Sequence, residues 1–233
     1  MGTLVLWDID GTLIRAGQIA GAVFATAVES MFGVAAHEHR VRYGGKTDPQ
    51  IAREILAALS IDHDAEVHLP QLMEALELGL AEGQQEMRES GVVLPGVEMV
   101  LARLHDHPEV VQSVLTGNTR ANAVLKLETF ALDRWIDVEL GAYGSDDADR
   151  NLLVPIALAR VASRHGAVDK GRTWVVGDTP FDAACAQAGG VRCLLVASGH
   201  ASREELEAAG ADLVVDDLSN TEAIVTLLTG AQS

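Results

Sequence analysis

Aromatic residues and cysteines are scarce in this sequence of 233 residues. Aromatic residues make up 4% of the chain, so the core must be built mainly from alanine, leucine and valine. The two cysteines, Cys185 and Cys193, stand in apolar surroundings and belong to no paired motif. This usage favours buried free thiols in a reducing cytoplasm over a disulfide bond.

Basic residues are also few, and long hydrophobic runs are missing. The 17 lysines and arginines face 34 acidic residues, which gives a net charge of −17. A surface this acidic repels nucleic acids and anionic lipids, so neither is an expected partner. The N-terminus, MGTLVLWDIDGTL, lacks a signal peptide pattern, and no segment approaches the ~18 apolar residues of a membrane span. We therefore expect a cytoplasmic protein, and any phosphate site must be made locally positive.

Short β-branched segments alternate with longer helical patterns over most of the chain. The segments with strand character cover residues 3–7, 110–115, 137–140, 173–176, 192–196 and 212–215. Helical patterns separate them, at residues 95–104, 118–130, 152–165, 180–188, 202–209 and 222–228. Strands that are apolar on both faces and separated by helices predict an α/β fold: a doubly wound, mainly parallel, Rossmann-like sheet.

One region breaks this alternation. Between residues 16 and 94 the pattern is helical, at 18–32, 49–59 and 65–88, with no convincing strand. We expect an inserted all-helical cap domain over residues 16–94. A catalytic core would then be made of residues 1–15 and 95–233, with a return hinge near residues 92–97 where Pro95 and Gly96 punctuate the chain.

Polar clusters follow three of the predicted strands. They are Asp8-Ile9-Asp10-Gly11-Thr12, Thr116-Gly117-Asn118, and the segment from Gly177-Asp178-Thr179 to Asp182. Ligands of doubly wound sheets bind outside the carboxyl ends of the strands, so these clusters are expected to converge. That convergence predicts a functional site.

Four carboxylates would meet at this point. Asp8 and Asp10 are two residues apart at a strand end, and Asp178 and Asp182 are four apart at the start of a helix. Asp178 alone could be a helix cap, and Asp10-Gly11 alone a turn. Taken together, carboxylates this close repel one another unless a cation neutralises them, and hard oxygen ligands suit Mg²⁺.

These motifs resemble those of the haloacid dehalogenase-like (HAD) superfamily of hydrolases. The shared patterns are Asp-x-Asp-Gly-Thr after the first strand, Thr-Gly-Asn after the second and Gly-Asp-x-x-x-Asp after the fourth. The helical insertion resembles the cap of the phosphoglycolate phosphatase-like subgroup. The resemblance spans essentially the whole chain and implies a Mg²⁺-dependent phosphatase that acts on a small phosphorylated metabolite.

The resemblance also implies roles for individual residues. Asp8 would be the nucleophile that forms an aspartyl-phosphate, and Asp10 would act as general acid and base. Mg²⁺ would be held by Asp8, Asp178 and the backbone carbonyl of Asp10, with Asp182 supporting its hydration shell. The phosphoryl oxygens would be bound by Thr116 and the N–H of Gly117, and Asn118 would orient the substrate.

One position departs from the family pattern. A lysine is usual near the start of the helix before the fourth strand, where this chain has Arg150. We expect Arg150 to stabilise charge in its place, although a solvated surface arginine is the alternative. Lys170 lies too close to Asp178 for this role, and Lys126 lies too far back, on the preceding helix. On this basis Arg150→Ala should lower turnover and leave thermal stability nearly unchanged.

The expected cap contains the glycine-rich segment Tyr43-Gly44-Gly45-Lys46-Thr47-Asp48. It is not a P-loop, because the first glycine of that motif is missing. The segment, with Arg42 and Lys46 as substrate-binding residues, is interpreted as a specificity loop that closes over the site. A helix–helix turn capped by Asp48 is the alternative.

Two other functional hypotheses stay open. A phosphomutase of the β-phosphoglucomutase type would share the nucleophile. A phosphate-ester-binding module without turnover would be consistent with the replacement of the usual lysine. The sequence allows either a monomer or a homodimer.

Overall fold

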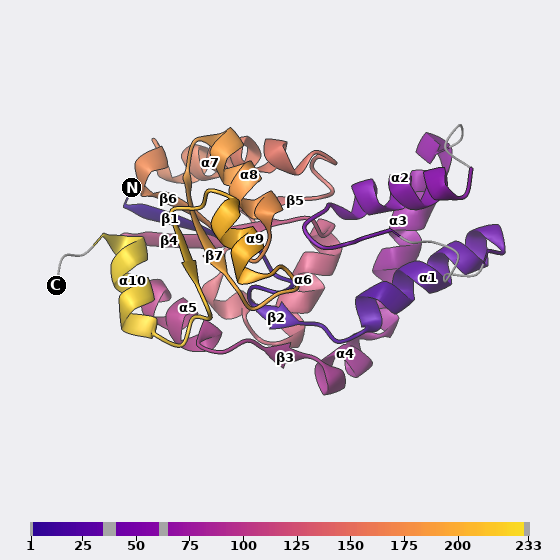
Figure 1. The fold of residues 1–233 in the computed structure, drawn as a ribbon, viewed down its shortest axis with the longest axis horizontal. Helices are drawn as coiled ribbons and strands as arrows, with labels where there is room; N and C mark the ends of the chain where they lie inside the picture. The colour runs from indigo at the N-terminus through magenta and orange to yellow at the C-terminus, as the bar shows by residue number, and fades with distance from the viewer. Residues whose placement is uncertain (1, 35–40, 61–64, 231–233) are drawn as a thin grey trace.

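The computed structural model describes residues 2–34, 41–60 and 65–230. Its main feature is a parallel sheet of six strands in the order β5-β4-β1-β6-β7-β8 (Figure 1). The strands are β1 (Thr3–Trp7), β4 (Val110–Thr116), β5 (Ala142–Tyr143), β6 (Thr173–Gly177), β7 (Arg192–Val196) and β8 (Leu213–Val215). The most N-terminal strand, β1, lies inside the sheet between β4 and β6.

Helices cover both faces of this sheet, because side chains alternate along each strand. Val5 and Trp7 join one hydrophobic cluster with α5 (Val97–His105), α6 (Arg120–Thr129) and α10 (Thr221–Thr229). Leu4 and Leu6 join another with α7 (Leu153–His165), α8 (Pro180–Gly189) and α9 (Arg203–Ala208). This arrangement confirms the doubly wound α/β prediction. Cys185 and Cys193 are both buried and free.

One predicted strand is wrong. Residues 137–140 form a turn, in which the Asp137 carboxylate accepts the N–H of Glu139 at 3.0 Å. The Leu140 N–H in turn donates to the Asp137 carbonyl at 3.3 Å. The edge strand is β5, whose Ala142 pairs with Leu115 of β4. The alternation of Val138 and Leu140 resembles that of a strand, but the hydrogen bond that the Asp137 side chain accepts favours the turn.

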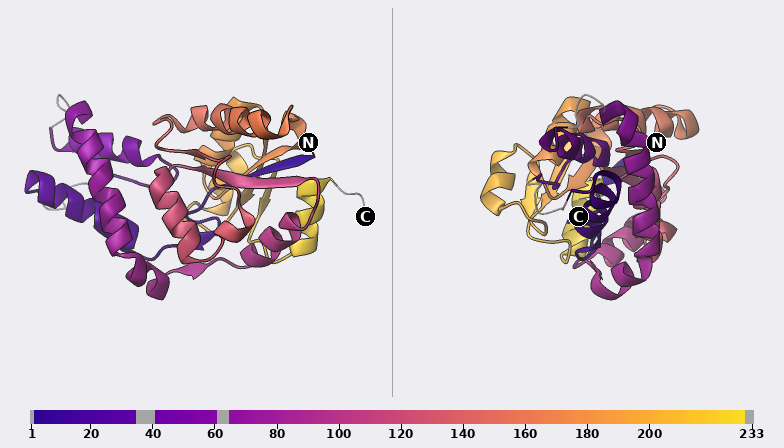
Figure 2. Two further views of the ribbon diagram at one scale, coloured as in Figure 1. Left: turned by 180° about the vertical axis from the view of Figure 1, so that it is seen from behind. Right: turned by 90° about the vertical axis from the view of Figure 1, so that its right-hand side faces the viewer.

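The insertion after β1 is helical, as predicted. It contains α1 (Ile19–Phe32), α2 (Asp48–Ala58), α3 (Ala65–Glu82) and α4 (Gln84–Ser90), and these helices form a lobe beside one end of the sheet (Figures 1 and 2). The predicted helix over residues 65–88 is divided at Gly83. Two short antiparallel strands, β2 (Ile14–Arg15) and β3 (Val92–Val93), join the lobe to the sheet and were not expected.

Three short 3-10 helices complete the described secondary structure, η3 (Asp133–Trp135), η4 (Arg150–Leu152) and η5 (Lys170–Arg172). Among the described residues, no helix has the length and apolar character needed to cross a bilayer. β1 runs toward the helical lobe in Figure 1, so the carboxyl ends of the parallel strands face that lobe. Polar residues that follow these strands therefore lie between the sheet and the lobe.

Candidate active site

A cavity of about 610 Å³ lies where the sheet meets the helical lobe. Its core side is lined by residues at the carboxyl ends of strands β1, β4 and β6, including Asp8, Asp10, Thr116, Gly117, Asn118 and Asp178. The three polar clusters recognised in the sequence therefore converge. Arg150 and Lys46 also line this cavity.

Asp8 is held at the floor of the cavity. It is 5% exposed, and its backbone N–H donates to the Val176 carbonyl at 2.9 Å. Burial raises the pKa of Asp8 to about 6, and Arg150 opposes that rise while Asp182 adds to it. The Arg150 guanidinium lies 3.3 Å from the Asp8 carboxylate. A carboxylate in this position is poorly solvated yet kept available as an anion by a fixed positive charge.

Three buried carboxylates form a possible metal site. Asp8, Asp178 and Asp182 each place a carboxylate oxygen within 4.8 Å of the others. Burial, and then the charges of Asp8 and Asp182, raise the pKa of Asp178 to about 8. Crowded carboxylates of this kind are the hard, anionic donors that Mg²⁺ prefers, so the donor set fits that ion.

Two glycines make room for Asp178. A Cβ atom on Gly11 would lie 2.3 Å from an Asp178 carboxylate oxygen, and one on Gly199 would lie 1.7 Å away. Gly11 also has a φ of +85°, a conformation that other residues adopt only with strain. The Thr12 hydroxyl donates to the same carboxylate at 3.2 Å. The Asp-Gly-Thr sequence after β1 thus positions a carboxylate that follows β6, while the part played by Gly199 had no sequence signal.

Arg150 lies in the site, as predicted. It begins η4, is 5% exposed, pairs with Asp182 and donates to the Gly45 carbonyl at 3.3 Å. Burial acts against its charge, but Asp182 and Asp8 more than offset that effect and raise the pKa of Arg150. The surface-arginine alternative is therefore wrong. The structure also gives no support to the expectation that Arg150→Ala leaves thermal stability nearly unchanged. Removal of this arginine would leave a buried carboxylate without its partner, which is destabilising.

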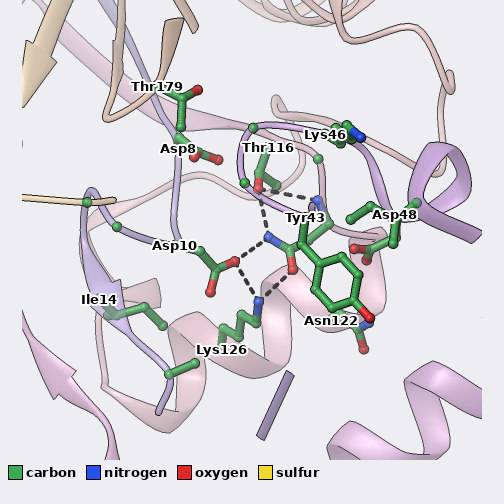
Figure 3. A pocket seen from close by; sticks show the side chains of 18 of the residues that line it. Asp8, Asp10, Ile14, Tyr43, Lys46, Asp48, Thr116, Asn122, Lys126 and Thr179 are labelled. Atoms are coloured by element: carbon green, nitrogen blue, oxygen red, sulfur yellow. Dashed lines mark hydrogen bonds and ion pairs between the residues drawn. The ribbon is translucent and has the colours of Figure 1, made fainter. Parts of the chain in front are cut away.

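Lys126 is a second cation in the site, and its exclusion on sequence grounds was wrong. It is 3% exposed, and its ammonium donates to the Asp10 carboxylate and to the Asn118 side-chain oxygen, each at 2.6 Å (Figure 3). Side chains of a helix lean toward its N-terminus, so a long lysine side chain from the second turn of α6 reaches back to the strand ends. Asn122 and Lys126 also line the cavity from one face of α6, and this four-residue spacing was the missed signal.

Thr116 and Asn118 link this cation to the end of β4. The Asn118 side-chain N–H₂ group donates to the Asp10 carboxylate and to the Thr116 hydroxyl oxygen, each at 2.8 Å. The Thr116 side chain also interacts with Asp8 and lowers its pKa against the larger effect of burial. Thr116 thus contacts Asp8, and Asn118 contacts Asp10, the two aspartates of the first motif.

The glycine-rich segment 43–48 docks on the core. The Asp48 N–H donates to the Gly117 carbonyl at 2.8 Å, and the Asp48 carboxylate accepts the Thr119 N–H at 2.9 Å. Thr47 is the N-cap of α2, and its hydroxyl also donates to the Ala148 carbonyl at 2.8 Å. The alternative in which Asp48 caps the helix is therefore wrong.

The two basic residues of this segment differ in position. Lys46 lines the cavity and pairs with Glu54. Arg42 is exposed and does not line the cavity, and its charge acts on Glu205 instead. The structure therefore brings Lys46, but not Arg42, to the predicted site.

Comparisons with known proteins agree with this geometry. A family model described as HAD-hydrolase-like matches residues 153–221. The chain is 31% identical to a phosphoglycolate phosphatase of Pseudomonas putida over 225 residues, which cover 92% of this chain and 76% of the relative. It is 29% identical to a phosphoglycolate phosphatase of Pseudomonas fluorescens over 99% of this chain and 85% of the relative.

A solved structure shows the same fold. The crystal structure of a hydrolase from Pseudomonas syringae superposes with a TM-score of 0.72 at 20% identity, covering 98% of this chain and all of that one (100%). The strand-end motifs, the helical insertion and these relatives point to one family. The chain belongs to the haloacid dehalogenase-like (HAD) superfamily and is a hydrolase of its phosphoglycolate phosphatase-like subgroup.

Proposed function

We propose that the protein is a Mg²⁺-dependent phosphatase that hydrolyses a small phosphorylated metabolite through an aspartyl-phosphate on Asp8. The observation that carries this proposal is the position of Asp8. Its carboxylate lies close enough to those of Asp178 and Asp182 for the three to bind one metal ion, and it lies beside Arg150. Phosphoryl transfer depends mainly on positioning and on neutralisation of charge. The cavity supplies acidic metal ligands and fixed cations around a single carboxylate.

The first half of the reaction is attack by Asp8 on phosphorus. Its carboxylate oxygen forms a bond to phosphorus while the bond to the ester oxygen breaks, and Asp10 gives that oxygen a proton. Asp10 is held for this task by Lys126 and by the amide of Asn118. Thr116 and the N–H of Gly117 bind the phosphoryl oxygens during the transfer.

The second half returns the enzyme to its starting state. Asp10, now a carboxylate, accepts a proton from water, and the resulting hydroxide attacks the phosphorus atom of the aspartyl-phosphate. The bond to the Asp8 oxygen breaks and inorganic phosphate leaves. Arg150 keeps the Asp8 carboxylate in its anionic form for the next cycle.

Mg²⁺ would be held by the Asp8 and Asp178 carboxylates and by the backbone carbonyl of Asp10. Asp182 would support its hydration shell. The ion supplies neutralisation of the negative charge that gathers on the phosphoryl group. The position of Asp178 between Gly11 and Gly199 fixes the direction of its carboxylate before any ion binds.

The proposal extends to the organisation of the chain. Residues 16–94 would form a cap over a core made of residues 1–15 and 95–233, since β2 and β3 form the two crossings between them. The segment 43–48 would act as the specificity loop. A cytoplasmic location is consistent with the two free buried thiols, and the assembly would be a monomer or homodimer.

Hydrolysis of p-nitrophenyl phosphate tests the central claim. We expect turnover with Mg²⁺, loss of turnover with EDTA, and loss in Asp8→Asn by at least ~10³-fold. Asp106→Asn, at an exposed position on the distant end of α5, is the matched control and should keep full activity. A correctly folded wild-type protein without metal-dependent turnover would contradict the proposal. Transfer of phosphate to a second hydroxyl of a sugar phosphate, in place of release to water, would identify the phosphomutase alternative.

A further inference from the structure

The side of the cavity formed by the helical lobe is apolar. Val23 and Phe24 of α1, Ile51 of α2, and Leu76 and Leu80 of α3 line it, and each is less than 9% exposed. They belong to three different helices, which pack against one another through these side chains. This wall lies opposite the carboxylates and cations of the strand ends.

The lysines and arginines that line the cavity are already engaged. Lys126 is bound to Asp10 and Asn118, and Arg150 to Asp182 and Asp8. Their partners belong to the reaction centre described above. Neither cation is free to receive a second anionic group of the substrate.

The other lysine and the other arginine of the cavity lining also have contacts within the chain. Lys46 forms an ion pair with Glu54, in which its side chain is 16% exposed. Arg15 donates to the Ser198 carbonyl at 2.6 Å. A substrate carboxylate placed against the helices of the lobe would therefore lose its hydration and meet an aliphatic wall among the described residues, which is unfavourable.

Two neutral polar groups mark the boundary between this wall and the reaction centre. Tyr43 projects into the cavity and packs against Phe24, with ring centroids 5.2 Å apart. Asn122 is 6% exposed, and its side-chain oxygen has no hydrogen-bond partner among the described residues. The unpaired amide oxygen of Asn122 only accepts hydrogen bonds, so it suits an uncharged donor on the substrate, such as a hydroxyl, and not an anion.

We propose that the leaving group of the substrate is an uncharged, largely apolar alcohol, alkyl or aromatic, and not a short acid such as glycolate. This inference rests on the proposed phosphatase function and names its substrate class. A cavity of about 610 Å³ is in the range of ~300–1,000 Å³ that sites for larger organic ligands occupy, so a two-carbon leaving group would leave most of the apolar wall uncovered.

A homologous series of phosphate esters tests the proposal. The values of kcat/KM are measured with Mg²⁺ for n-alkyl phosphates from methyl to hexyl, for benzyl phosphate and for 2-phosphoglycolate. Each methylene buried against the wall should raise kcat/KM by about fourfold until the cavity is filled. Benzyl phosphate should exceed 2-phosphoglycolate by at least ~100-fold.

Three variants test whether the apolar wall causes the dependence of kcat/KM on chain length. Leu76→Asn should flatten the dependence on chain length, whereas Leu78→Asn, on the same helix but 59% exposed, should keep it. Val23→Thr changes one methyl group to a hydroxyl at nearly constant volume and should lower the slope without a loss of folding, which thermal unfolding checks. A slope that is the same in wild type, Val23→Thr and Leu76→Asn would overturn the assignment of this wall.

The outcomes of these experiments distinguish a failure of the proposed phosphatase function from a failure of the inference about the leaving group. Absence of turnover on every ester would contradict the phosphatase function itself. In that case binding of hexylphosphonate and of phosphonoacetate, measured by calorimetry, still tests the inference, and tighter binding of phosphonoacetate would overturn it. Turnover with 2-phosphoglycolate equal to or above hexyl phosphate would overturn the inference and leave the phosphatase function intact.

Discussion

Asp10 and Asp8 face different cations, and this separates their roles. Lys126 contacts Asp10, whereas Arg150 contacts Asp8 and Asp182. The family lysine is therefore not simply replaced by arginine in this chain. One buried cation orients the proposed acid–base group, and the other stabilises the proposed nucleophile.

Lys126→Met tests the first of these roles. Without the ammonium, Asp10 loses the partner that fixes its carboxylate, and kcat should fall by about 10²–10³-fold. Lys170→Met is the matched control, because Lys170 donates to the Gly189 carbonyl away from the cavity. Steady-state kinetics on p-nitrophenyl phosphate are the measurement. Equal kcat values for wild type and Lys126→Met would show that the ion pair with Asp10 has no part in turnover.

Arg150→Ala tests the second role. It should lower kcat/KM by at least about 10²-fold, and in the absence of Mg²⁺ it should also destabilise the fold by about 3–5 kcal/mol, because Asp182 would keep a buried and unpaired charge. Thermal unfolding and kinetics are compared with Arg150→Lys, which restores a charge but not the forked geometry. An unfolding temperature like that of wild type would contradict the buried ion pair.

The element that links the helical lobe to the site is the segment before α2. Gly45 has a φ of +77°, and a Cβ atom there would lie 2.4 Å from the Phe181 ring. Gly44, its neighbour, would place a Cβ atom in open space. Of these two adjacent glycines, only Gly44 has room for a side chain.

Gly45→Ala should weaken the docking of this segment. A left-handed conformation costs a non-glycine residue about 1–2 kcal/mol, so kcat/KM should fall by about tenfold or more. Gly44→Ala is the control and should behave like wild type. The measurement is kcat/KM for a good ester substrate at constant Mg²⁺. Indistinguishable effects of the two substitutions would mean that the docked conformation is not the active one.

Elements and strand ends could be predicted from the sequence to different degrees. The positions of Asp8, Thr116 and Asp178 follow from the rule that parallel strands end at one edge, so their convergence was foreseen. Lys126 was missed because its contact depends on the direction of a long side chain along α6. The docking of Asp48 on Thr119 was missed because it joins two segments whose packing no local pattern reports.

At the scale of the whole molecule, the buried carboxylates couple stability to pH. Burial raises the pKa of Asp8 to about 6 and that of Asp178 to about 8, above their unfolded values. Groups shifted in this direction contribute stability that is fully present below the unfolded pKa of ~3.9 and is lost as the pH rises through the folded values. The metal-free protein should lose stability between about pH 4 and pH 8 through these two groups.

Mg²⁺ should reverse this loss. At about pH 8.5 a concentration ~100 times Kd should raise the unfolding temperature by about 5–10 °C, and at about pH 5 the rise should be much smaller because protons compete for the same oxygens. Differential scanning calorimetry with and without MgCl₂ measures both. Asp178→Asn should remove the pH-dependent gain while Asp106→Asn retains it. Equal gains at the two pH values would count against a carboxylate metal site.

The central place of β1 has a consequence for the order of folding. Thr3 of β1 pairs with Val110 and Leu4 with Thr173, so both neighbours of this strand lie more than a hundred residues further along the chain. Such long loops must close, at a cost in chain entropy, before the stabilising contacts between the strands can form. Assembly of the sheet is therefore slow. The helices of the insertion have largely local contacts and can form earlier. The carboxylate at Asp8 therefore acquires its surroundings only after these long loops have closed and β6 has paired with β1.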